Sequence, residues 1–249
     1  MTNPNTVYRT LECRPDSYQG WYDQGNKLRS QNHLQDALFS YEKALEYYPE
    51  DYFAWYYHGK VSEELGYYEQ ALNSFQQACE IQPENYWAWY SSGYILQEKN
   101  ENYTKSVKFL QIALSNNPQD YWATYRLGKA YLYQKKYLLA IDFFQQALNI
   151  RPHDYWCYYR CGECRQKLRQ YQLATISYQK ALQSKPDDYW ATHSLMQLFK
   201  AQCLYYDVIK LCHQLLKIDE DNPEILETLS LAYAITGNQE KAKFYQEQL

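Results

Sequence analysis

The chain has 249 residues, a formal net charge of −4 at pH 7 and hydrophobic residues at 46% of its positions. A net acidic chain has no general attraction to nucleic acid or to anionic membrane surfaces, and no apolar run approaches the roughly 20 residues that a membrane-spanning helix requires. The first ten residues lack the basic and apolar regions of a secretory signal, and the odd number of cysteines, seven, fits a reducing compartment. We therefore expect a cytoplasmic protein without a transmembrane segment.

Prolines and glycines mark a repeat of 34 residues. Six of the eight prolines follow one another in steps of 34, 34, 35, 34 and 34 residues, and five glycines keep the same steps. These residues are Pro15, Pro49, Pro83, Pro118, Pro152 and Pro186, with Gly25, Gly59, Gly93, Gly128 and Gly162. A period of this length is typical of an array of stacked structural units.

Each unit is predicted to be a helix–turn–helix. Good N-cap residues precede the first helix of six units, namely Ser17, Asp51, Asn85, Asp120, Asp154 and Asp188. Gly66, or Asn32 and Asn100 in neighbouring units, ends the first helix, and the proline of the unit prevents the second helix from continuing. In chain order we expect an N-terminal partial repeat or capping segment at 1–16 and an array at 17–249, with units at about 17–50, 51–84, 85–119, 120–153, 154–187, 188–222 and 223–249.

The unit resembles the tetratricopeptide repeat, whose pattern is W-x2-L-G-x2-Y followed by A-x3-F, A and P. The second unit matches it with Trp55, Gly59, Gly66, Tyr68, Ala71, Phe75, Ala78 and Pro83. The sixth unit departs from it, with Met196 in place of the glycine and Val208 in place of an alanine. The resemblance implies an all-α, right-handed α-solenoid or superhelix of stacked helix–turn–helix repeats. The Tyr-Trp-Ala start of the units is similar to repeats of cyanobacterial proteins of this class.

Three cysteines raise the question of an iron–sulfur enzyme. Cys157, Cys161 and Cys164 have the spacing C-x3-C-x2-C, which radical-SAM enzymes use to hold a cluster. In the repeat frame, however, they occupy positions of a first helix where other units have small or apolar residues such as Ala123 and Leu127. A free cysteine behaves as a small hydrophobic residue. We therefore predict packing residues, with no metal and no cofactor.

Other catalytic patterns are missing from the sequence. The five histidines are scattered without an HExxH or paired metal spacing. There is neither a glycine-rich phosphate loop nor a G-x-S-x-G nucleophile turn. The sequence therefore predicts no catalytic residues and a protein that is not an enzyme.

Aromatic residues form a second stripe on the first helices. Counting from the residue after the N-cap, positions 4, 8 and 11 form the packing seam, and positions 2, 5, 9 and 12 form the stripe. The resemblance implies that the stripe lines a concave groove, whereas tyrosines at position 1 are expected to pack. The alternative is that the stripe rings also pack and fill space. The candidate partner-binding residues are Tyr22, Asn26, Phe53, Tyr56, Trp87, Tyr90, Tyr94, Trp122, Tyr125, Arg126, Lys129, Trp156, Tyr159, Arg160 and Trp190.

Basic residues gather in the middle of the chain. Residues 119–186 hold eleven basic and four acidic residues, while the flanking segments are acidic. We expect the groove to suit an extended segment that combines proline, aromatic or aliphatic residues with some acidic ones. The clamp of certain co-chaperones for acidic chaperone tails needs lysines where this chain has Tyr22 and Trp87, so that specificity is not transferred.

The sequence thus predicts a non-catalytic scaffold, adaptor or assembly factor that binds an extended peptide or protein segment. Single-stranded nucleic-acid binding is the first alternative, because Trp, Tyr and Arg stack on bases, but a net acidic chain disfavours it. A regulatory or structural subunit of a larger enzyme or defence complex is the second. Nothing in the sequence indicates a homo-oligomer.

Overall fold

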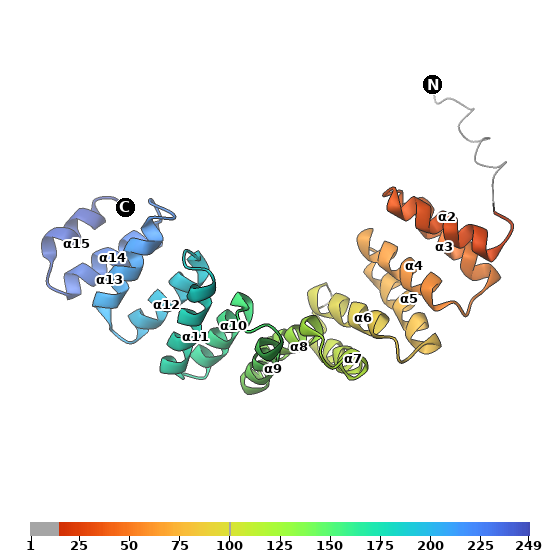
Figure 1. The fold of residues 1–249 in the computed structure, drawn as a ribbon. Helices are drawn as coiled ribbons and strands as arrows, with labels where there is room; N and C mark the ends of the chain where they lie inside the picture. The colour runs from red at the N-terminus through yellow and green to blue at the C-terminus, as the bar shows by residue number, and fades with distance from the viewer. Residues whose placement is uncertain (1–14, 100) are drawn as a thin grey trace, which may run out of the picture. The chain divides into compact units, whose positions relative to one another are not determined.

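The computed structural model describes residues 15–99 and 101–249, which form fourteen helices and no strand (Figure 1). The first helices of consecutive pairs are α2 (Tyr18–Ser30), α4 (Tyr52–Glu64), α6 (Tyr86–Glu98), α8 (Tyr121–Tyr133), α10 (Tyr155–Lys167), α12 (Tyr189–Ala201) and α14 (Pro223–Ile235). The second helices are α3 (Leu34–Tyr47), α5 (Tyr68–Ile81), α7 (Tyr103–Asn116), α9 (Tyr137–Ile150), α11 (Tyr171–Ser184), α13 (Tyr205–Leu216) and α15 (Gln239–Gln246). The all-α prediction is confirmed.

The chain divides into two compact units, one that ends at Arg126 and one that begins at Leu127. In the first unit, α2 packs on α3, α3 on α4, α4 on α5, α5 on α6 and α6 on α7. In the second unit, α9 packs on α10, and each later helix packs on the next through α15. The segment expected at 1–16 lies almost entirely outside the described residues.

The N-caps begin the first helices as predicted. The side chains of Ser17, Asp51, Asn85, Asp120, Asp154 and Asp188 each accept a hydrogen bond from a backbone N–H in the first turn. Asn222 does the same for Ile225 at the start of α14. Each cap satisfies an N–H group that has no partner within its helix, and this fixes where the helix begins.

A left-handed residue ends most of the first helices. Gly66 and Asn32 have φ angles of 82° and 63°, as expected for residues that stop a helix, and Asn100 lies outside the described residues. The same conformation occurs at Lys135, Arg169 and Cys203, with φ of 59° in each. The N–H of the following residue then bonds a carbonyl five residues back, which is the Schellman geometry; these bonds join Tyr67 to Ser62, Lys136 to Tyr131 and Gln170 to Arg165.

Glycine on the first helix makes room for a ring on the second. A Cβ added to Gly59, Gly128 or Gly162 would lie 2.7 Å from a ring carbon of Phe75, Phe144 or Tyr178 respectively. The rings are almost completely buried. In the α12–α13 pair the sizes are exchanged, because Met196 stands at the glycine position and Cys212 at the ring position, both fully buried in one cluster.

The three cysteines of α10 are packing residues. Cys157 and Cys164 have no exposed surface and Cys161 has 2%. Burial raises the pKa of Cys161 to about 11 and that of Cys164 to about 12, so both side chains are neutral thiols at neutral pH. Their place on the buried face of α10 accounts for the C-x3-C-x2-C spacing without a metal cluster.

Candidate partner-binding surface

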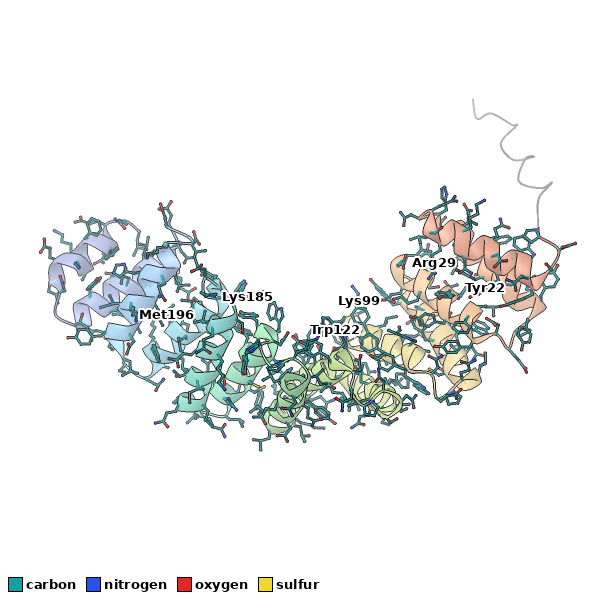
Figure 2. All side chains as sticks on the ribbon, in the orientation of Figure 1. Tyr22, Arg29, Lys99, Trp122, Lys185 and Met196 are labelled. Atoms are coloured by element: carbon teal, nitrogen blue, oxygen red, sulfur yellow. The ribbon has the colours of Figure 1, made fainter. Side chains whose placement is uncertain are left out.

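An exposed row of aromatic rings begins the first helices. The second residue of five of these helices is aromatic and between 44% and 61% exposed. The exposed row has two parts, each within one unit: Phe53, Trp87 and Trp122 in the first unit, and Trp156 and Trp190 in the second. Figure 2 shows Trp122 at the start of α8. Large aromatic rings are normally mostly buried, so an exposed ring that recurs from helix to helix is typical of an interaction surface.

Each ring of the row is held edge-to-face by the tyrosine that precedes it. The centroid distance is 5.1 Å for Tyr86–Trp87, with an interplanar angle of 80°. The other four pairs repeat this arrangement at 5.0 to 5.5 Å and 76° to 88°. Edge-to-face geometry is a favoured arrangement of two rings. The exposed rings are therefore oriented before any partner arrives.

Two of the supporting tyrosines are hydrogen-bonded to the next helix pair. The hydroxyl of Tyr86 donates to Oδ1 of Asp120 at 2.7 Å, and the hydroxyl of Tyr155 donates to Oδ1 of Asp188. Burial and the neighbouring carboxylate raise the pKa of both tyrosines, so they stay protonated and keep donating. The acceptor in each case is the N-cap residue of the following first helix. These contacts confirm that tyrosines at position 1 pack.

The tyrosines at position 5 face their neighbours and are half-buried. Tyr90 stacks on Tyr86 at 5.4 Å and 21°, and Tyr22, Tyr56, Tyr125 and Tyr159 stack in the same way one turn from the first tyrosine of their helix. The hydroxyl of Tyr159 is 3.3 Å from Oγ of Ser194 in the next first helix. The two positions of the predicted stripe therefore differ, since position 2 is exposed and position 5 contributes mainly to stacking between rings.

Arg126 joins two consecutive first helices within the first unit. Its Nε donates to the hydroxyl of Tyr90 at 3.0 Å, and its Nη1 donates to Gln97 at 3.2 Å and to Glu98 at 3.0 Å. Its guanidinium also lies 4.2 Å from the ring centre of Tyr94. The structure thus brings Tyr90, Tyr94 and Arg126 together in a contact that already uses much of the guanidinium.

The remaining candidates also have contacts within the chain. Oδ1 of Asn26 accepts a hydrogen bond from the hydroxyl of Tyr41 at 2.8 Å. Arg160 pairs with Glu163 on its own helix at 2.7 Å. Lys129 is half-buried, with its amine 5.8 Å from the ring centre of Tyr133. These contacts limit how far the polar candidates can reach toward a partner.

A lysine that the sequence reasoning missed lies beside the row in the second unit. The amine of Lys185 is 4.7 Å from the ring centre of Tyr155 and 5.7 Å from that of Trp156. Both distances lie within the range of cation–π attraction. A lysine three residues before the N-cap of the next first helix is the sequence signal that could have identified it.

The described part of the chain contains no site with the ligands of a metal. Among residues 15–99 and 101–249, no group of three or more His, Cys, Asp or Glu side chains could hold an ion. In the same residues, no helix has both the length and the apolar character needed to cross a membrane.

Solved structures show the same fold. The C-terminal part of a TPR repeat-containing protein from Cytophaga hutchinsonii matches with a TM-score of 0.78 and 18% identity, over 91% of this chain and 93% of that one. MamA matches with a TM-score of 0.65 and 21% identity, over 68% and 92%. YrrB, described as a TPR protein with an unusual peptide-binding site, matches with a TM-score of 0.61 and 21% identity, over 71% and 91%.

Two family models match the sequence. The TPR domain of cytochrome c-type biogenesis protein H matches residues 22–158, and a tetratricopeptide repeat matches residues 157–188. No protein in the search of curated sequences matches. The paired helices, the glycine-to-ring packing and these family models lead to one conclusion: the chain is an all-α solenoid and belongs to the tetratricopeptide-repeat family.

Proposed function

We propose that this protein is a non-catalytic scaffold that binds an extended peptide or protein segment on the exposed row. The observation that carries the proposal is the edge-to-face pairing of each exposed ring with a buried or half-buried tyrosine. Ordering a side chain on binding costs free energy, and here the fold has already restricted the rings. Interfaces depend most on aromatic anchors of this kind.

The fold supports the general role. Proteins of the tetratricopeptide-repeat family are generally non-catalytic scaffolds for other proteins, and one structural neighbour, YrrB, is described as having a peptide-binding site. We extend this to the present chain and assign it no catalytic residue. We retain the division into a capping segment at 1–16 and seven units over 17–249, and on the cysteine usage we place the protein in the cytoplasm.

The partner segment should carry apolar or proline side chains with acidic ones beside them. The rings of the row offer apolar faces, and in the second unit the amine of Lys185 lies next to Trp156. A carboxylate of the partner can approach that amine while an apolar side chain covers the indole. Residues 119–186, which include Lys185, hold the excess of basic side chains.

Truncation of a row tryptophan tests the proposal. A peptide selected from a displayed random library on the wild-type protein is titrated against Trp122→Ala and Trp156→Ala. We expect affinity to fall about thirtyfold, since removal of a central aromatic anchor costs about 2 kcal/mol or more. Thermal stability should fall only by about the 1 kcal/mol of the lost ring pair, because both rings lie half in solvent.

A matched control uses an exposed aromatic residue outside the row. Tyr206 on α13 is 78% exposed, and Tyr206→Ala should leave the affinity of the selected peptide unchanged. An equal loss of affinity in this control, or unfolding of Trp156→Ala, would contradict the assignment. Oligonucleotide binding that weakens steeply with salt, without any peptide binding, would instead support the nucleic-acid alternative.

A further inference from the structure

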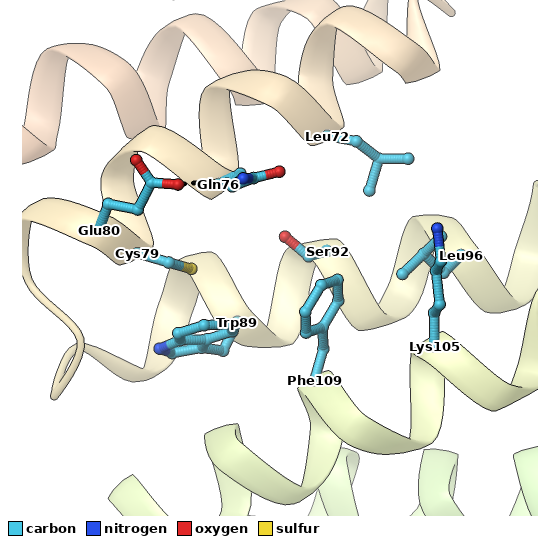
Figure 3. A pocket seen from close by; sticks show the side chains of 9 residues that line it. All are labelled: Leu72, Gln76, Cys79, Glu80, Trp89, Ser92, Leu96, Lys105 and Phe109. Atoms are coloured by element: carbon cyan, nitrogen blue, oxygen red, sulfur yellow. Dashed lines mark hydrogen bonds between the residues drawn. The ribbon is translucent and has the colours of Figure 1, made fainter.

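A pocket lies between α5, α6 and α7 in the first unit (Figure 3). It encloses about 390 Å³. An apolar cavity of about 150 Å³ can hold benzene, and small-molecule sites begin at about 300 Å³. The lining residues are Leu72, Gln76, Cys79, Glu80, Trp89, Ser92, Leu96, Lys105 and Phe109.

The inner part of the pocket is apolar and aromatic. The rings of Trp89 and Phe109 lie 5.5 Å apart at an interplanar angle of 50° and form a wall of two tilted planes. Cys79 and Leu96 are buried and close the interior. The indole N–H of Trp89 donates to the carbonyl of Pro83 at 2.8 Å, which fixes the plane of that ring. The walls are therefore preformed for a flat apolar group.

An equivalent pocket one helix pair earlier shows what this one lacks. It is lined by residues at matching helix positions, with Trp55 for Trp89, Gln70 for Lys105 and Ser74 for Phe109. In place of Ser92 it has His58, a buried ring whose Nδ1 lies 2.7 Å from Oγ of Ser74. The earlier pocket encloses about 370 Å³, and polar side chains such as His58, Ser74 and Gln70 form much of its lining. With Ser92 in place of the histidine and Phe109 in place of Ser74, the later pocket has an apolar, aromatic wall instead.

In the second unit, a side chain of the chain reaches the equivalent position. Between α10 and α11, the guanidinium of Arg165 donates to Oγ of Ser177 and to the carbonyl of Leu173. Ser177 stands in α11 where Phe109 stands in α7. The aromatic lining of this site is therefore a property of the particular side chains at α5, α6 and α7 rather than of the fold.

The two ends of the pocket differ in charge. Figure 3 shows Glu80 and Lys105 at opposite ends. The carboxylate of Glu80 already accepts hydrogen bonds from Gln76 at 3.0 Å and Gln77 at 3.3 Å. Within residues 15–99 and 101–249, the ammonium of Lys105 has neither an ion-pair nor a hydrogen-bond partner. The end that can accept a charged group is therefore the cationic one.

We propose that this pocket binds a small aromatic carboxylate, with its ring system against Trp89 and Phe109 and its carboxylate at Lys105. The pocket belongs to a different surface from the exposed row. On α6, Trp87 and Trp89 are two positions apart, or about 200° around a helix of 3.6 residues per turn. The site is thus independent of the function proposed for the row.

Indole-3-propionate is a probe with this chemistry, and two-dimensional 1H–15N NMR reports where it binds. The indole N–H signals of the seven tryptophans are followed during titration of the full chain, with Trp89 assigned through Trp89→Phe. We expect the Trp89 signal to move, with a dissociation constant of about 1 mM or lower for a ligand of this size. The signals of Trp87 and Trp122 should stay in place.

Two variants copy the earlier pocket into the later one. Ser92→His should place a bulky polar imidazole against the aromatic wall and weaken binding at least tenfold, and its melting temperature verifies that the protein still folds. Lys105→Gln is a surface change that should weaken binding of the carboxylate by about two- to fivefold, the range of an exposed ion pair. It should leave binding of the neutral amide, indole-3-propionamide, unchanged.

Three results would overturn the proposal. The first is an unmoved Trp89 signal at 10 mM probe, roughly ten times the expected dissociation constant. The second is equal binding by wild type and a folded Ser92→His. The third, equal affinity of wild type for the acid and its amide, would remove the role of Lys105. Since none of these involves the exposed row, they leave the proposed function to its own test.

Discussion

The glycine–ring pair sets how closely two helices of a pair approach. At Gly128 no side chain fits, because Phe144 occupies the space that a Cβ would need. The α12–α13 pair satisfies the same contact with Met196 and Cys212, so a large residue on one helix requires a small one on the other. Protein interiors tolerate exchanges that conserve volume and resist those that add it.

Gly128→Met should therefore destabilise the protein by about 1–3 kcal/mol through overpacking. The double variant Gly128→Met with Phe144→Cys copies the natural exchange and should recover a large part of that loss. Urea unfolding followed by circular dichroism measures both free energies. If the double variant loses more unfolding free energy than the two single variants lose together, the two residues do not share one space.

Neighbouring helix pairs are joined through their ends. The N-cap aspartates Asp120 and Asp188 each accept a backbone N–H of their own helix and a tyrosine hydroxyl of the preceding pair. In each aspartate, Oδ1 accepts both the backbone N–H and the tyrosine hydroxyl. The start of one helix is thus coupled to the position of the helix before it, and the tyrosine held there supports an exposed ring of the row.

Tyr155→Phe removes this bond and keeps the ring. We expect a loss of about 1.5–3 kcal/mol, the range for a hydrogen bond to a charged group, measured by urea unfolding. Tyr158→Phe on the same helix is the control, because its hydroxyl donates to the neutral carbonyl of Pro152 at 3.0 Å and should cost about 0.5–1.5 kcal/mol. A larger loss at Tyr158 than at Tyr155 would argue against the coupling.

Buried titratable groups give the whole molecule a limited range of stable pH. Burial raises the pKa of Cys161 to about 11 and of Cys212 to about 12, whereas an unfolded thiol titrates near 8.5. Above about pH 8.5 the folded state therefore holds protons that the unfolded state loses, and stability falls as pH rises. Burial lowers the pKa of His58 in the folded state, so stability also falls as pH drops below about 6.5.

The urea midpoint should accordingly be highest between about pH 6.5 and 8.5 and decrease on both sides. Unfolding series from pH 5 to 10 in a reducing buffer measure this profile. His58→Gln should make the acidic side less steep, with the remainder due to His213, whose pKa burial also lowers. The alkaline side should stay unchanged, since the cysteines are untouched. An unchanged acidic side in that variant would show that His58 does not cause it.

The sequence alone determined the helices, their order and their family. Capping by Asp154, termination at Gly66 and the 34-residue period depend on residues close in the chain, so local rules predict them. The packing of Cys157, Cys161 and Cys164 followed from the same register. The angle between positions 2 and 4 on a helix also predicted that Trp122 and Trp156 turn away from the packing seam.

Only the tertiary structure decided which of the candidate side chains are available. Arg126, Tyr90 and Tyr159 have partners up to 36 residues away, in a neighbouring helix pair. Three left-handed helix ends, at Lys135, Arg169 and Cys203, carry neither glycine nor asparagine. The apolar, aromatic wall of the pocket beside Trp89 depends on Ser92 in one helix and Phe109 in the next. Such features arise from the distances between stacked helices, which no local pattern in the chain specifies.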